Sequence, residues 1–209
     1  MKFTAVLSTF LAALAVANPR PGNPDYPSLS ARAPDKVEET DSWKRAFEAA
    51  KKAGVNIVPN NIYYFTVVWR RGQAQGDPTH LKAEELKHLQ EKLGFDHIAV
   101  VVGKMEETRT KEKKTKTNKD PATVIKRDFK ARKWDLGKEK DTDKTSIRSP
   151  NWDSKRDAGL EVNWGGQTTA AKEGKIKKMA DDWKKENPVY KVETNNCAVF
   201  KDKVFDVLK

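Results

Sequence analysis

Two stretches of the chain, residues 61–69 and 95–103, are apolar or aromatic at nearly every position. Runs of this length without polar alternation are typical of strands that are covered on both faces of a sheet. Residues 122–137 also have strand-like content, and residues 160–164 alternate between apolar and polar side chains until two glycines interrupt them. Together with a short strand at 189–192, these segments predict a small, mainly antiparallel sheet.

Four further segments have the spacing of amphipathic helices, with apolar side chains three and four positions apart. Leu86 and Leu89 share one face of the second segment, and Gly94 ends it. The last segment begins at Cys197, after two asparagines that supply a cap. The pattern therefore predicts an α+β fold in which helices flank the sheet. The predicted helices cover residues 41–53, 79–93, 170–186 and 197–208.

The first 17 residues have the three parts of a secretory signal peptide: a basic start at Lys2, an apolar run from Phe3 to Val16 and a small-x-small site that ends at Ala17. The alternative is a retained anchor. The length of the run argues against it, because a membrane span needs about 20 apolar residues. We therefore expect a secreted, extracellular protein that begins near Asn18 and has no membrane-spanning segment.

The rest of the chain divides into a leader and one domain. Residues 18–40 contain five of the ten prolines and almost no large apolar side chains, which is typical of a disordered segment. Residues 41–209 hold the predicted elements and are expected to form a single α+β domain. Two polar stretches, residues 104–120 and 138–158, interrupt this domain and are expected to be solvated inserts.

The chain is basic, with 41 Lys and Arg against 30 Asp and Glu and a formal net charge of +11. This balance indicates a surface that attracts polyanions, and residues 104–120, with seven basic and four acidic side chains, are one candidate for it. The alternative is a solvated loop whose lysines keep the protein soluble. Aromatic side chains do not alternate with the basic ones there, which argues against a nucleic-acid groove.

One cysteine and three histidines limit the chemistry that the chain can perform. A single cysteine excludes an intramolecular disulfide framework and a multi-cysteine metal site. Three histidines argue against a histidine-rich metal cluster. The sequence contains no P-loop, zinc-finger spacing or dinucleotide-binding glycine motif, so no metal or other cofactor is expected.

Cys197 and His97 form the one nucleophile–base pair that this chain can build with sulfur. Cys197 lies in the first turn of the last predicted helix, where the helix dipole favours a thiolate, and His97 lies in an apolar strand that would fix its orientation. His88 points away from the leucine stripe and His80 lies in a polar loop, so neither suits the role. The alternative is that Cys197 is a small buried side chain on a stripe shared with Phe200, and that His97 is a structural, hydrogen-bonded residue.

Two segments resemble parts of the circularly permuted papain-like thiol enzymes. Residues 97–103 resemble the strand of that fold in which a histidine precedes an apolar run and a glycine, and residues 190–200 resemble its closing segment, in which two asparagines precede the cysteine. Lecithin-retinol-acyltransferase-like and desumoylating-isopeptidase-like proteins share the order of histidine before cysteine, as do secreted fungal proteins with the same ending. The resemblance extends over roughly residues 90–208. The chain departs from the family at Ala198, where glutamine or glutamate often follows the cysteine.

The resemblance implies a permuted papain-like fold and a role for each candidate residue. Cys197 would be the nucleophile and His97 the general base and acid. Family members tend to carry a third polar partner on the next strand, which points to Asp135 here, with Asn163 as the second choice. Backbone N–H groups at the start of the last helix would stabilise the oxyanion.

Two functions remain open at this stage. The first is a small secreted thiol hydrolase, or an acyl or amide transferase, that acts on a protein, peptide or lipid substrate through Cys197 and His97. The alternative is a non-catalytic, effector-like secreted binding protein that retains the scaffold and presents a basic surface.

Overall fold

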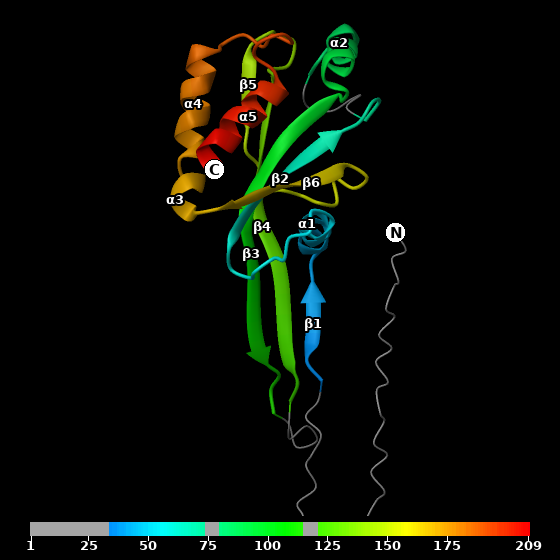
Figure 1. Ribbon diagram of the computed structural model, residues 1–209, viewed down its shortest axis with the longest axis vertical. Helices are drawn as coiled ribbons and strands as arrows, with labels where there is room; N and C mark the ends of the chain where they lie inside the picture. The colour runs from blue at the N-terminus through cyan, green and yellow to red at the C-terminus, as the bar shows by residue number, and fades with distance from the viewer. Residues whose placement is uncertain (1–33, 74–79, 115–120) are drawn as a thin grey trace, which may run out of the picture. The chain divides into compact units, whose positions relative to one another are not determined.

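The computed structural model describes residues 34–73, 80–114 and 121–209, and this part of the chain forms an α+β fold around a mixed sheet of six strands (Figure 1). The expected α+β class is therefore confirmed. The strands lie in the order β1-β4-β3-β2-β6, with β5 beside β4, and β1 is parallel to β4 while the other pairs are antiparallel. Their bounds are β1 Lys36–Glu39, β2 Ile62–Trp69, β3 His97–Lys111, β4 Thr123–Lys138, β5 Thr145–Arg148 and β6 Glu161–Thr168.

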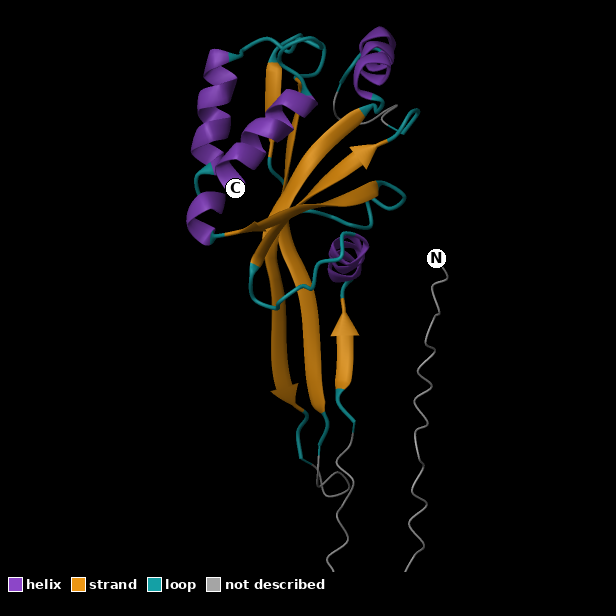
Figure 2. Cartoon of the chain, viewed as in Figure 1, coloured by secondary structure: helices purple, strands orange, loops and turns teal. Residues whose placement is uncertain are grey.

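Helices cover both faces of the central strands (Figure 2). The first helix packs against one face, and the last two helices pack against the other. The helix expected over residues 170–186 is divided in two at Gly174, a poor helix former. The helices are α1 Asp41–Lys52, α2 Ala83–Leu93, α3 Ala170–Glu173, α4 Ile176–Glu186 and α5 Cys197–Leu208.

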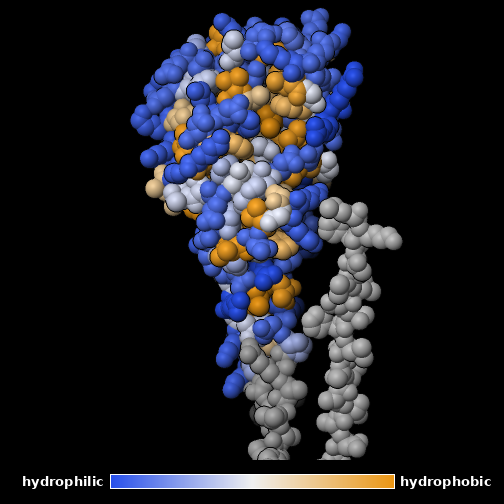
Figure 3. All heavy atoms as spheres, viewed as in Figure 1, coloured by the Kyte–Doolittle hydropathy of each residue, from blue (hydrophilic) through white to orange (hydrophobic). Residues whose placement is uncertain are grey.

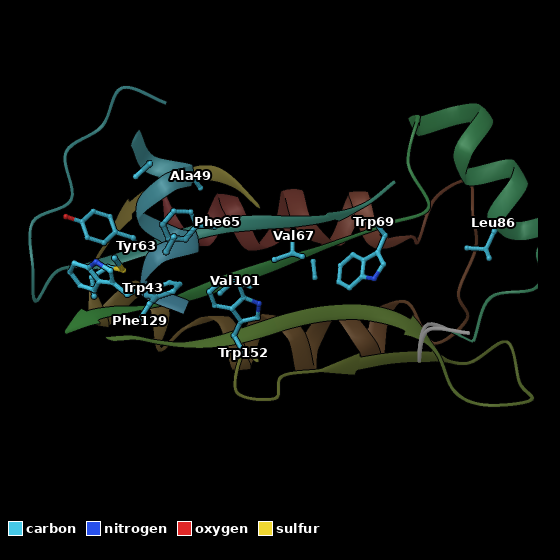
Figure 4. Packing of buried hydrophobic residues seen from close by; sticks show 14 residues of the cluster. Trp43, Ala49, Tyr63, Phe65, Val67, Trp69, Leu86, Val101, Phe129 and Trp152 are labelled. Carbon is cyan, nitrogen blue, oxygen red and sulfur yellow. The ribbon is translucent and has the colours of Figure 1, made fainter. Parts of the chain in front are cut away.

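The continuous apolar runs of β2 and β3 are explained by helices that pack on both faces of these strands. Along β2, Phe65 and its odd-numbered neighbours pack with Trp43 of α1 in one core cluster (Figure 4). Tyr64 points to the opposite face and joins the cluster that contains Phe200 of α5. Since successive side chains of a strand point to opposite faces, every position must be apolar when both faces are covered.

Several charged segments that the sequence assigns to a leader or to solvated inserts are part of the sheet. Residues 36–39, expected in the disordered leader, form β1, and residues 104–111, expected in the first insert, continue β3. Their pairing is supported by backbone hydrogen bonds and by ion pairs, such as that of Arg127 with Glu39 at 3.0 Å and with Glu107 at 2.8 Å. Because these strands are stabilised by hydrogen bonds and ion pairs between polar residues, the hydropathy pattern of the sequence does not reveal them.

The second stretch that was expected to be a solvated insert, residues 138–158, is also structured. It contains β5 and the buried side chain of Trp152, whose indole Nε1 donates a hydrogen bond of 2.9 Å to Asp157. Asp157 also forms an ion pair with Lys133 at 2.9 Å, which attaches this segment to β4.

The expected signal peptide (residues 1–17), the leader up to residue 33 and part of residues 104–120 lie outside the described residues. None of the helices in the described ranges has the length and apolarity needed to cross a membrane.

We expect Gly103→Ala to destabilise the protein by about 3 kcal/mol, because a side chain there overpacks the sheet. Gly103 lies in β3 opposite Ala131 of β4, and a Cβ at this position would overlap the carbonyl oxygen of Lys130 and the backbone of Ala131. Urea unfolding measures the change. The matched control is Gly174→Ala. The backbone of Gly174 is helical, and a Cβ there would lie 3.3 Å from its nearest atom, the carbonyl oxygen of Ala170. A Gly103→Ala variant as stable as this control would contradict the close approach of the two strands.

Candidate functional site

The site is centred on His97, the first residue of β3. Its imidazole is fully buried, and its Nε2 lies 2.6 Å from Oδ1 of Asp135 on the neighbouring strand β4. The ring of Trp69, which is paired with His97 across β2 and β3, packs against the imidazole with ring centroids 4.9 Å apart. The sequence-predicted residues His97 and Asp135 are therefore in direct contact, and Trp69 restricts the orientation of the ring.

Asp135 lies between two cationic groups on the two strands that flank β4. Its Oδ2 accepts a hydrogen bond of 2.7 Å from Arg148 of β5, the residue paired with it across the two strands. Burial by itself raises the pKa of Asp135, but the charge of His97 and then that of Arg148 outweigh it and lower the pKa to about 2. The carboxylate is thus charged at neutral pH.

The electrostatic balance at His97 favours the protonated ring. Burial by itself lowers the pKa of His97, but the negative charges of Asp135 and then of Cys197 outweigh it and raise the pKa to about 10. The hydrogen bond to Asp135 acts in the same direction, and so does the nearby side chain of Cys197. Because Nε2 contacts Asp135, Nδ1 is the ring nitrogen that remains for the thiol.

Cys197 is the first residue of α5 and lies next to the capping residue Asn196. The Asn196 side-chain carbonyl accepts hydrogen bonds from the backbone N–H groups of Ala198 and Val199, at 2.9 and 3.0 Å. Its amide group donates to the carbonyl of Val192 at 2.6 Å, so the same side chain also fixes the preceding loop. The predicted cap is present, and it determines where Cys197 begins the helix.

Asn195 holds the loop that leads into Cys197. Its buried side-chain amide donates to the Thr145 hydroxyl at 2.8 Å and to the carbonyl of Val189 at 2.8 Å, while its carbonyl accepts from the indole of Trp183 at 3.0 Å. The segment 189–192, expected to be a strand, is a loop with isolated bridges to its neighbours. The hydrogen bonds of Asn195, and not strand pairing, hold this segment in place.

The thiol and the imidazole are closed off from solvent. Cys197 is 1% exposed and packs against Val68 and Ile98. A cavity of about 620 Å³ is lined in part by Asp135, Arg148 and Lys133, and Cys197 is not among its lining residues. Access to the sulfur therefore requires a movement of the surrounding structure.

Helix α2 connects the two sides of the site through ion pairs. Near its start, Glu85 pairs at 2.8 Å with the buried amino group of Lys138, three residues after Asp135 on β4. Near its end, His88 and Lys92 pair with Glu193, which precedes Cys197 in the loop before α5. The helix thus spans from the strand that carries Asp135 to the segment that carries the thiol.

The other sequence candidates lie elsewhere. Asn163 is on β6, which β2 separates from β3, and with Arg70 it lowers the pKa of Glu161 on the same strand. His88 is exposed on α2, and His80 precedes that helix. Of the two proposed third members, the structure brings Asp135 to His97 and leaves Asn163 apart.

Sequence reasoning missed two residues of this site, Arg148 and Tyr190. Arg148 lies in a stretch that was interpreted as a solvated insert, and only the pairing of β5 with β4 reveals its contact with Asp135. Tyr190 is the first residue of the closing segment 190–200, and the sequence assigns it no role. Its hydroxyl is buried near the backbone of Cys197.

Comparison with known proteins adds no assignment, since no family model, no curated protein and no solved structure matches the chain.

We expect Asp135→Asn to lower the pKa of His97 well below its value of about 10, because the variant loses the largest charge that holds the ring protonated. NMR titration of the imidazole, assigned with a His97→Gln variant, measures the change. Because the pKa of His97 is raised in the folded state, its contribution to stability is complete below pH 6.5 and is lost as the pH rises through about 10. Because the pKa of Asp135 is lowered, its contribution is complete above pH 3.8 and is lost as the pH falls through about 2.

The difference in unfolding free energy between wild type and Asp135→Asn should therefore be largest between pH 3.8 and 6.5 and should shrink toward pH 10 and pH 2. A difference that does not change with pH would show that His97 and Asp135 are not an ion pair.

We expect Asn195→Ala to destabilise the fold by about 3 kcal/mol, because the substitution leaves several buried hydrogen-bonding groups without a partner. Urea unfolding again measures the change. Asn163→Ala is the matched control, since this half-buried asparagine lies on β6 away from the loop. Its expected cost is below about 1 kcal/mol. Equal effects of the two substitutions would show that Asn195 does not hold the loop before Cys197.

Proposed function

We propose that the protein is a small thiol hydrolase, or an acyl or amide transferase, in which Cys197 is the nucleophile. The observation that carries this proposal is the contact of His97 Nε2 with Asp135 at 2.6 Å, which orients the ring and leaves Nδ1 for the thiol. A nucleophile, a base and an orienting carboxylate are the three parts that thiol catalysis needs. The same proposal includes the fold. It would be a permuted papain-like fold that starts at the strand of His97 and ends at the helix of Cys197.

In this proposal the resting site is a thiolate–imidazolium pair. Asp135 keeps His97 protonated, and the adjacent positive charge would stabilise the sulfur as the anion that attacks. The imidazolium then donates its Nδ1 proton to the leaving group. In the second half of the reaction the neutral ring accepts a proton from water as the acyl–thioester is hydrolysed.

A second candidate function is favoured by the burial of Cys197 and His97, which are 1% and 0% exposed. A non-catalytic binding protein of the effector-like kind would keep the two side chains as packed core residues and act through its surface. The face shown in Figure 3 is mostly hydrophilic, with small apolar patches between the polar side chains. A surface of this kind, on a chain with a net charge of +11, suits a polyanionic partner.

Secretion is part of both proposals and rests on the signal-peptide pattern of residues 1–17. The substrate class that we propose for the enzyme is a protein, peptide or lipid that offers an acyl or amide carbonyl.

The two functions predict different reactions of the thiol with iodoacetamide. Since the sequence has one cysteine, labelling of the folded protein reports on Cys197 alone. An ordinary thiol loses roughly 100-fold in alkylation rate between pH 8 and pH 6. For the enzyme we expect a loss of less than about tenfold over this range, and a steep pH dependence in His97→Gln.

Mass spectrometry of the modified protein measures the rates, and thermal unfolding confirms that the variant is folded. A thiol that reacts only after unfolding in urea, with the same result for wild type and His97→Gln, would instead support the binding protein.

A further inference from the structure

Two buried polar atoms beside Cys197 have no hydrogen-bond partner among the described residues. They are Nδ1 of His97 and the hydroxyl of Tyr190, and the two side chains are 0% and 4% exposed. A buried polar group without a partner costs about 1–3 kcal/mol, so such groups are rare and need an explanation. The proposed reaction accounts for Nδ1, which faces the thiol in that mechanism, but it does not use the tyrosine.

Tyr190 is held firmly in place. Its backbone N–H donates a hydrogen bond of 2.8 Å to the carbonyl of Asp143, and its ring packs in the cluster that contains Leu136 of β4 and Phe200 of α5. The next residue, Lys191, is closed against Asn195 by backbone hydrogen bonds of 3.1 and 2.9 Å. The hydroxyl therefore has little freedom to find a partner elsewhere.

The surroundings keep this hydroxyl protonated and close to the first turn of α5. Burial, and then the negative charge of Cys197, raise the pKa of Tyr190 far above its ordinary value, so the hydroxyl keeps its proton and can donate it to a hydrogen bond. The backbone N–H of Cys197 lies near the hydroxyl and acts on this pKa in the opposite direction.

The capping of α5 limits which backbone groups can bind a substrate oxygen. The N–H groups of Ala198 and Val199 donate to the Asn196 side chain, and that of Phe200 donates to the Asn196 carbonyl at 3.0 Å. Of the first-turn amides in this described helix, that leaves the N–H of Cys197, which faces the Tyr190 hydroxyl. One backbone donor is fewer than an oxyanion hole normally offers, and the Tyr190 hydroxyl lies beside that donor.

We propose that Tyr190 donates a hydrogen bond to the oxyanion that forms when Cys197 attacks a carbonyl, together with the backbone N–H of Cys197. This inference rests on the proposed thiol chemistry and adds a catalytic residue to it. The thiolate forms a bond to the carbonyl carbon, and the π electrons of the C=O bond move to its oxygen, which accepts the two hydrogen bonds. When the C=O bond re-forms, the bond to the leaving group breaks, and the Nδ1 proton of His97 passes to the leaving group where that group needs one.

Tyr190→Phe tests the role with two reagents that differ in whether an oxyanion forms. Iodoacetamide alkylates sulfur by direct displacement, without an oxyanion. p-Nitrophenyl acetate acylates sulfur through a tetrahedral oxyanion and releases nitrophenolate. We expect Tyr190→Phe to alkylate at the wild-type rate within about twofold and to lose roughly 100-fold in the rate of acylation, the range for removal of one oxyanion donor.

Tyr64→Phe is the matched control, since Tyr64 is buried in the same cluster but lies on β2, next to Gly166. We expect it to change neither rate. Tyr190→Phe should also unfold at the wild-type temperature or higher, because it removes a buried hydroxyl that has no partner.

Wild-type acylation in Tyr190→Phe would overturn the role of Tyr190 while leaving the thiol chemistry intact. An equal loss in both reactions would also overturn it, since Tyr190 would then act on the thiol itself. Wild-type protein that is neither alkylated nor acylated in the folded state would overturn the proposed function, and with it this role.

Discussion

Both faces of β2 and β3 are covered by helices, and this constraint determines where charge can enter the fold. Along the buried middle of these strands no side chain is charged, because a charged group there would have neither water nor a partner. His97 occupies the first position of β3, where β4 and β5 supply Asp135 and Arg148. The buried ion pair of His97 and Asp135, with Arg148 beside it, thus lies at one end of these strands. Removing one member of such a set leaves an uncompensated buried charge, which typically costs 3–5 kcal/mol.

The position of α5 follows from the same arrangement. The helix buries Phe200, Val204 and Leu208 against the sheet, so its axis is fixed by apolar packing. Its start has to coincide with the charged end of the sheet, and packing alone cannot set where a helix begins. The side chains of Asn195 and Asn196 set the start of α5, because each forms hydrogen bonds to backbone or side-chain groups on both sides of the loop.

The sequence predicts those parts of the fold that depend on apolar spacing. β2, α1, α2 and α5 lie within a few residues of the predicted segments, because the continuous apolar run of β2 and the helical spacing of the others follow their burial. β1 and the distal half of β3 were missed, since residues such as Glu107 and Arg109 are polar and their strand pairing is a long-range property. Single polar residues were harder still. Asp135 was named only by its place on the strand after His97, while Arg148 and Tyr190 acquire their positions through pairing and loop closure.

The burial of Cys197, His97 and Tyr190 has both a benefit and a cost for the chemistry proposed here. A pocket without water strengthens every interaction of the thiolate, the imidazolium and a hydroxyl donor. It also makes any polar atom without a partner unfavourable by its full desolvation free energy. A protein that used Cys197 and Tyr190 only as packing would be more stable with a phenylalanine in place of Tyr190, because the ring would fill the same space without the orphaned hydroxyl. Proteins keep local costs of this kind at functional sites. The ion pairs of α2 offer a route to opening, since the pair with Glu193, a side chain that is 54% exposed, is weak and screened by salt. A reaction of the kind proposed would have to open this closed site and supply partners for its unsatisfied atoms.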